Sequence, residues 1–172
     1  LAISAWKSTG ETSWALRVNP SSGNLHPTEG YLICGLMDGR SCGLSVCHFA
    51  PKEHVLEVRA EFGLGQWSKL CEGFPTGTFL LGLTSIHWRE AWKYGQRAYR
   101  YCQHDAGHAI GAISIAAAGL GWQTIILDDL GTDELELLMG TVWDHGAERE
   151  EPDVLMAVVP CVTERKASGL PR

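Results

Sequence analysis

Three short stretches of this sequence carry side chains whose types and spacing could do chemistry. The first is the motif RVNPSSG, which combines a cation, two hydroxyls and an accessible glycine backbone. The residues concerned are Arg17, Pro20, Ser21, Ser22 and Gly23. Such a loop can cradle a phosphate or bind the polar edge of a planar ring. The same residues also fit an ordinary turn between two elements of secondary structure.

The second stretch, KYGQRAYRY, begins with Lys93 and Tyr94 and adds cations at Arg97 and Arg100. A lysine or tyrosine whose pKa is shifted by burial can serve as a general acid or base. The alternative is the start of a helix whose cations lie in solvent and whose tyrosines cover the core.

The third stretch, HDAGH, places His104 and His108 four residues apart, a spacing that metal ligands use on one face of a helix. It lacks the glutamate that follows the first histidine of a metalloprotease helix. A third ligand would have to come from a distant residue such as His26, His48 or His87. We therefore expect a hydrogen-bonded histidine pair and no metal.

A long helical pattern must position two of these stretches. It runs from Trp88 to Trp122, and no charged residue follows Asp105 within it. Small and apolar residues occupy nearly all sides of this helix, which predicts a buried central helix. Gly119 and Gly121 suit its C-terminal end, where a left-handed residue is favoured. The run is too short for a membrane span and has no basic flank.

Short apolar runs around this helix predict strands in a mixed, mainly antiparallel sheet. Residues 1–7 are expected to end a helix, and the turn MDGRSCG is expected to join the first two strands as a hairpin. A further short helix is expected over 66–74, and Thr132 is expected to cap the helix that follows it. The strands are expected at 30–37, 44–50, 78–86, 124–127 and 153–159, and residues 54–60 are expected to form a strand or a connecting turn.

Length and composition favour a single α+β domain over residues 1–172. The net charge of −6 argues against a general nucleic-acid or anionic-membrane partner. Six scattered cysteines without a CxxC pair favour reduced thiols in a cytoplasmic protein. Because the chain opens with Leu1, we expect the N-terminal start of the domain to be missing. Neither a GxGxxG nor a GxxxxGK[ST] motif supports a Rossmann or P-loop site.

Taken together, RVNPSSGNLHPTEGYLI, WKYGQRAYRY and GHAIGAISIAAAGLGW resemble the nitroreductase superfamily of flavin enzymes. They are most similar to its SagB/ThcOx-type branch, the azoline dehydrogenases. That branch has a PSxGxxxP loop, a [KR]YGxRxYR segment and a GHxxxxxxxxAxxLG helix in the same order. The segments ELELLMG and EEPDVLMAVVP extend the resemblance, so that it covers the chain from Leu1 to Pro160.

The resemblance implies an α+β flavoprotein that forms a homodimer, with FMN at the subunit interface and the central helix in that interface. The loop from Pro20 to Gly23 would touch FMN, with Arg17 nearby. Arg17, Arg97 or Arg100 could supply a cation for the FMN phosphate in place of the family's N-terminal arginine segment. The sequence ILDD, which contains Leu127 and Asp128, aligns with the family's loop near the flavin N5 atom.

The branch also implies an activity. Lys93 and Tyr94 match the pair that azoline dehydrogenases use to remove a proton while a thiazoline or oxazoline is oxidised. We therefore predict an FMN-dependent oxidoreductase acting on a peptide or a small molecule. Two alternatives remain. One is a flavin-free scaffold or partner subunit with the same fold, suggested by the missing arginine segment and by Asp128 and Asp129. The other is a metal-dependent hydrolase built on His104 and His108.

Overall fold

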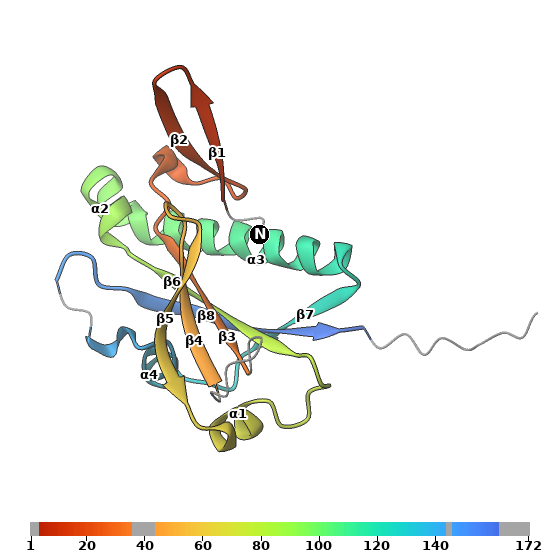
Figure 1. The fold of residues 1–172 in the computed structure, drawn as a ribbon. Helices are drawn as coiled ribbons and strands as arrows, with labels where there is room; N and C mark the ends of the chain where they lie inside the picture. The colour runs from red at the N-terminus through yellow and green to blue at the C-terminus, as the bar shows by residue number, and fades with distance from the viewer. Residues whose placement is uncertain (1–3, 36–43, 144–145, 162–172) are drawn as a thin grey trace, which may run out of the picture.

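A six-stranded antiparallel sheet forms the centre of the molecule, and helices cover both of its faces (Figure 1). The computed structural model describes residues 4–35, 44–143 and 146–161. The long helix α3 lies on one face of the sheet, and the shorter helices α1 and α4 lie on the other. A two-stranded hairpin, β1–β2, projects beside α3.

The bounds of the elements follow the chain in order. The strands are β1 (Ser4–Thr9), β2 (Thr12–Arg17), β3 (Thr28–Cys34), β4 (Leu44–Ala50), β5 (Val55–Phe62), β6 (Phe79–Ser85), β7 (Trp122–Leu127) and β8 (Glu151–Pro160). The α-helices are α1 (Leu64–Leu70), α2 (Trp88–Tyr94), α3 (Ala98–Gly119) and α4 (Thr132–Met139). Short 3₁₀ turns are η1 (Ser22–Asn24), η2 (Gly95–Arg97) and η3 (Thr141–Trp143).

The strand order of the large sheet is β5-β4-β3-β6-β8-β7, with every pairing antiparallel. Alternation along β3 turns Glu29, Tyr31 and Ile33 toward the face that carries α1 and α4. The main apolar core lies between this face and those helices. Gly82 of β6 lets α4 approach closely, because a Cβ at that position would collide with Met139 Sδ.

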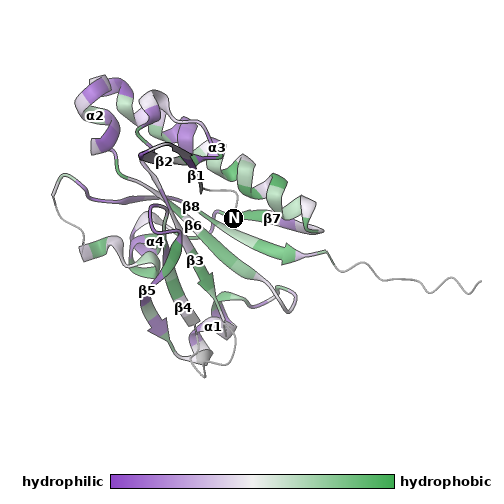
Figure 2. Ribbon diagram, turned by 45° about the horizontal axis from the view of Figure 1, so that its top comes forward, coloured by the Kyte–Doolittle hydropathy of each residue, from purple (hydrophilic) through white to green (hydrophobic). Residues whose placement is uncertain are grey.

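Helix α3 packs on the opposite face through one stripe of small residues. Ala106, Ala109 and Ala117 are buried against the sheet, whereas Ile115 is 76% exposed. The prediction of a helix buried on all sides is therefore wrong for the single chain. The sheet offers α3 only one contact surface, so the outer side remains uncovered. Figure 2 shows that the second half of α3 is largely hydrophobic, whereas α2 is largely hydrophilic.

The expected order of strands and helices is confirmed for most of the described chain, including β4, β6, β8 and the end of α3 at Gly119. The helix expected over residues 1–7 is wrong, because Ser4–Thr9 pairs with β2 as a strand. Gly10 has a φ of +59°, and with Glu11 it forms the two-residue turn of a hairpin where the end of a helix was expected. The turn MDGRSCG lies outside the described residues.

A smaller correction concerns the start of α4. Its N-cap is Gly131 rather than Thr132, and the Gly131 N–H donates to Glu134 Oε2 over 2.8 Å. The Glu134 carboxylate thus accepts a hydrogen bond at the start of the helix, where the N-cap glycine has no side chain to do so. Within the described residues, no helix is both long and apolar enough to cross a membrane.

Candidate functional site

The loop around η1 meets the end of α2, which brings together two of the stretches singled out in the sequence. Gly23 has a φ of +63°. A Cβ added there would lie 2.5 Å from Lys93 Nζ and 2.7 Å from Tyr94 Oη. Only glycine therefore fits this position without displacing both side chains. The predicted cofactor loop and the predicted acid–base pair belong to one site.

The two side chains from α2 are held differently. Lys93 is exposed, and its ammonium lies 5.4 Å from the centre of the Tyr94 ring. Tyr94 is half-buried, and its ring packs edge-to-face on Tyr101 of α3 with centroids 4.7 Å apart. The site therefore offers a fixed hydroxyl and a more mobile ammonium beside the same loop, two groups able to donate or accept a proton.

The loop is also tied within itself. The backbone N–H of His26 donates to Ser21 Oγ over 2.9 Å, and His26 Nε2 lies 2.9 Å from Asn24 Oδ1. Burial lowers the pKa of His26, and the nearby charge of Arg17 adds to that effect.

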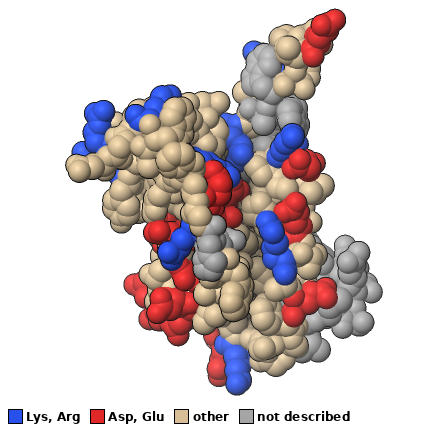
Figure 3. Space-filling view, turned by 90° about the vertical axis from the view of Figure 1, so that its left-hand side faces the viewer, with Lys and Arg blue, Asp and Glu red and all other residues tan. Residues whose placement is uncertain are grey.

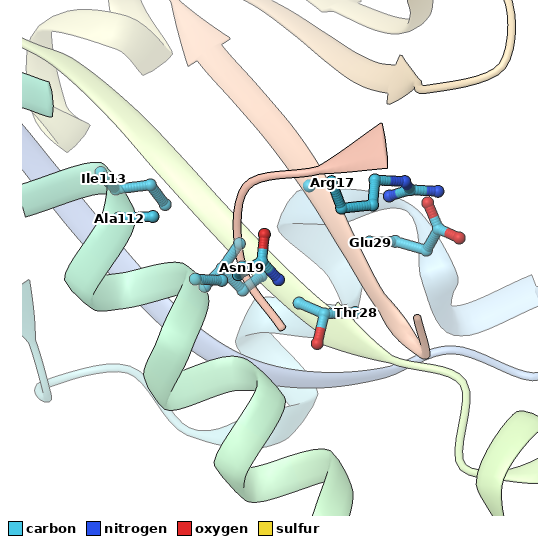
Figure 4. A pocket seen from close by; sticks show the side chains of 9 residues that line it. Arg17, Asn19, Thr28, Glu29, Ala112 and Ile113 are labelled. Atoms are coloured by element: carbon cyan, nitrogen blue, oxygen red, sulfur yellow. The ribbon is translucent and has the colours of Figure 1, made fainter. Parts of the chain in front are cut away.

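A small cavity opens beside the loop, between β2, β3 and α3 (Figure 4). Arg17 lines it and points toward Glu29, while the small side chain of Ala112 comes from α3. Burial lowers the pKa of Arg17 and the charge of Arg89 lowers it further, whereas Glu29 opposes the shift. The half-buried guanidinium is available to an anionic group at this edge of the site.

Glu29 anchors a partnered cluster of charges. It is 7% exposed, and it binds Arg89 of α2 and His48 Nε2, the latter at 3.1 Å. His48 Nδ1 lies 3.1 Å from Glu57 on β5. Burial alone would raise the pKa of Glu29, but the hydrogen bonds from His48 and Arg89 lower it. This cluster ties β3, β4, β5 and α2 together.

Two other buried carboxyls lie under the loop and lack such partners. Glu90 of α2 is 0% exposed and Asp105 of α3 is 1% exposed. Among the described residues, neither oxygen of Glu90 nor Oδ2 of Asp105 has a hydrogen-bond partner. Burial raises the pKa of both groups, and for Glu90 the charge of Asp105 adds to the effect.

Exposed cations surround the entrance to the site. Lys93, Arg97 and Arg100 come from α2, η2 and the first turn of α3. Figure 3, which faces the α2 end of the molecule, shows basic side chains at the upper left and most acidic side chains below them. Arg97 is exposed, so an anion can reach its guanidinium from solvent.

The remaining predicted residues lie elsewhere. Leu127 ends β7 and packs on the core face that carries α4, whereas the 21–24 loop lies on the α3 side of the sheet. Asp128 follows it and is exposed. His104 and His108 are exposed on α3, and no group of three potential ligands in the described part of the chain could hold a metal ion.

Sequence reasoning missed Glu29, His48, Arg89 and Glu90 as members of buried clusters. Strand alternation could have found the first, since Glu29 shares a face with Tyr31 and Ile33. No local signal marks Glu90, because its burial depends on α3 and on the loop packing over it.

Comparison with known proteins identifies the fold. No family model and no curated protein matches the sequence. Among solved structures, the chain is similar to a candidate nitroreductase from Anabaena variabilis, with a TM-score of 0.69 and 24% identity over 91% of this chain and 32% of that one. A second candidate nitroreductase, from Ralstonia eutropha, gives a TM-score of 0.62 and 17% identity over 86% of this chain and 64% of that one.

A third similar structure is a chain of the E. coli microcin synthetase McbBCD complex with truncated pro-MccB17 bound. Its TM-score is 0.67, with 20% identity over 84% of this chain and 55% of that one. The present chain spans less than two thirds of the length of each of these proteins. At these identities the likeness concerns the fold. The chain therefore has the nitroreductase-like α+β fold that its sequence motifs predict.

Proposed function

We propose that this chain is the cofactor-binding core of an FMN-dependent oxidoreductase related to the azoline dehydrogenases. The observation that carries the proposal is the meeting of Gly23 with Lys93 Nζ and Tyr94 Oη. A loop of the kind that binds phosphates or ring edges there adjoins two groups able to transfer a proton. The nitroreductase-like fold and the order of the sequence motifs give independent support.

The residues present fit such a cofactor. Gly23 contributes no side chain where the loop faces Lys93 and Tyr94, and the backbone N–H groups of such a turn can bind the polar edge of a flat ligand. Arg17 would meet an anionic group at the inner edge, and Arg97 would do so at the outer edge. FMN, when bound, supplies the two-electron redox chemistry. The protein binds and orients it and handles the proton at Lys93 Nζ and Tyr94 Oη.

The uncovered side of α3 supports a homodimer as part of this proposal. Ile115 of α3 is 76% exposed and Leu120 at the C-cap of α3 is 63% exposed, beside glycines and alanines that would let a second helix approach closely. The exposed Asp128 would then lie near the cofactor of the other copy, whereas Leu127 stays packed in the core of its own chain. Sedimentation equilibrium measures the association directly, and a monomer at micromolar concentration would contradict this part of the proposal.

The first test is FMN binding, measured by the visible spectrum and by fluorescence titration of the purified chain. Gly23→Ala should weaken binding by about tenfold or more, because the left-handed φ and the crowded Cβ position force the loop backbone itself to move away from α2. Gly10→Ala is the matched control, since Gly10 has a similar φ of +59° but a Cβ there meets nothing within 4 Å. Equal effects of the two substitutions would contradict the assignment of the loop.

The second test separates binding from chemistry. Tyr94→Phe and Lys93→Ala should each lower turnover of an azoline-containing peptide by roughly a hundredfold, the usual worth of a general acid or base. Both variants should retain most of their FMN affinity. Wild-type rates in both variants would remove these residues from the reaction.

A second candidate function is a flavin-free partner subunit. It is favoured by the likeness to a chain of a multi-subunit synthetase and by the exposed carboxylates of Asp128 and Asp129. A colourless protein that does not bind added FMN would favour this function over the enzyme.

A further inference from the structure

The two unpartnered carboxyls under the loop belong to different helices but surround one serine. Glu90 lies three residues before Lys93 and four before Tyr94, so all three share one side of α2. Asp105 comes from α3. A hydrogen bond from the Ser21 side chain lowers the pKa of both carboxyls, and one from the Ser22 N–H lowers the pKa of Asp105. The protonation of the two carboxyls and the conformation of the loop can therefore affect each other.

The available hydrogen-bond donors do not suffice for two ionised carboxylates. The Ser21 hydroxyl has one proton to donate, and its oxygen already accepts from the His26 N–H. It can therefore serve one carboxylate at a time, and with the Ser22 N–H directed to Asp105 the buried oxygens of the pair still outnumber their donors. An ionised carboxylate in that position is costly, and a second one beside it adds repulsion. Retaining one proton removes both penalties.

The surrounding basic residues favour ionisation of both groups, against the effect of burial. On α2, Lys93 favours ionisation of Glu90, and on α3, His104 and His108 favour ionisation of Asp105. Cys102 of α3 is a buried neutral thiol, and burial together with the charges of Glu90, Asp153 and Asp105 raises its pKa to about 12. Asp153 of β8 also acts on Cys102, but Ser85 and Gln103 satisfy its own oxygens.

We propose that Glu90 and Asp105 form a coupled pair that retains one proton and thereby holds the 21–24 loop in its place against Lys93 and Tyr94. When the pair is singly protonated, Ser21 and Ser22 satisfy the remaining charge and the loop stays seated. When the proton is lost, Lys93 is the nearest cation that can compensate Glu90. Its ammonium is then drawn away from the loop. Glu90 and Asp105 are positioning residues, since they act through the loop and Lys93.

The first experiment follows protonation directly and needs no flavin. The side-chain carboxyl carbons of Glu90 and Asp105 are followed by ¹³C NMR during a pH titration of the whole chain. We expect one proton to remain on the pair at neutral pH, and we expect Glu90→Gln to lower the titration midpoint of Asp105. The matched control, Glu72→Gln in an exposed turn, should leave that midpoint unchanged. Titration of both groups in the ordinary carboxyl range would overturn the proposal.

If Glu90→Gln does not fold, Asp105→Asn provides the reciprocal measurement, in which the midpoint of Glu90 should fall. The wild-type titration is decisive without either variant, because it shows whether a proton remains on the pair at neutral pH.

The second experiment measures the consequence for the loop, which rests on the proposed function. FMN affinity of the wild type should fall by roughly fivefold or more as the pair loses its proton, and Glu90→Gln should abolish this pH dependence. Titration of the pair with a pH-independent affinity would overturn the link to the loop. Proton retention without FMN binding at any pH would sustain the pair and overturn the proposed function instead.

Discussion

Two buried glutamates of this molecule differ in their partners rather than in their burial. Glu29 is 7% exposed and Glu90 is 0% exposed, so water is excluded from both. Burial by itself raises the pKa of each, yet the pKa of Glu29 ends below its ordinary value and that of Glu90 above it. The difference comes from Arg89 and His48, which serve Glu29 and have no counterpart at Glu90 within the described chain.

Helix α2 connects the two clusters through neighbouring residues. Arg89 turns toward Glu29 on β3, while Glu90 turns toward Asp105 on α3. Successive residues on a helix point about 100° apart, so one short helix serves both sides. The partnered cluster fixes α2 on the sheet, and the unpartnered one lies under the loop that we assign to the cofactor. The Glu29 cluster that fixes α2 on the sheet is thus adjacent to the Glu90–Asp105 pair under the loop.

The largest expected effect comes from neutralising the partnered glutamate. Glu29→Gln leaves Arg89 and His48 without their shared carboxylate, and breaking a buried ion pair in this way costs about 3 kcal/mol. We expect the free energy of unfolding at pH 7, measured by urea denaturation, to fall by that amount. Glu57→Gln, whose side chain is 47% exposed, is the control and should cost much less. A loss below about 1 kcal/mol at Glu29 would break the comparison.

A smaller effect should appear as a pH dependence. The hydrogen bond to Glu29 is the main cause that raises the pKa of His48, against the effect of burial, and Glu57 adds to it. A raised folded pKa means that the contribution of His48 is complete below pH 6.5 and is lost as the pH rises through the folded value. Wild-type stability should therefore fall across that window. In His48→Gln this fall should vanish; urea titrations at several pH values measure it.

Glu29 contributes to the pH dependence of stability with the opposite sign to His48. Its lowered pKa stabilises the fold above its ordinary value of 4.5, and this contribution is lost as the pH falls through the folded value. The His48–Glu29 pair should therefore be most stabilising between the two windows. A wild-type profile with no loss on the alkaline side would show that His48 does not carry the charge assigned to it.

The sequence predicts most of the strands and helices, but it does not predict the partners that distinguish Glu29 from Glu90. The positions of strands along the chain could be predicted, because apolar runs such as TFLLGLTSI are typical of strands in a buried sheet. The first hairpin was missed because SAWKST can be read as either helix or strand, and the two-residue turn at Gly10 decides it. The site could be approached through its motifs, since the loop and Lys93–Tyr94 were identified separately. Their contact depends on tertiary packing.

The clusters themselves could not be predicted in the same way. Nothing in WREAWKY says that Arg89 meets Glu29, 60 residues earlier, or that Glu90 is enclosed while Lys93 is exposed. Partners that decide the sign of a pKa shift come from other elements of the fold, so local pattern carries no information about them.

The smallest expected effect is also the most discriminating, because it has the opposite sign. The raised pKa of Glu90 means that wild-type stability falls as the pH rises above 4.5 toward the folded value. Glu90→Gln removes this fall, and the new amide can donate to the unpartnered Oδ2 of Asp105. At pH 7 the variant should therefore be equal to the wild type or more stable by about 1 kcal/mol, with Glu72→Gln as the exposed control. The same substitution thus weakens the fold at Glu29 and spares it at Glu90. A loss at Glu90 as large as that at Glu29 would mean that partners do not distinguish the two sites.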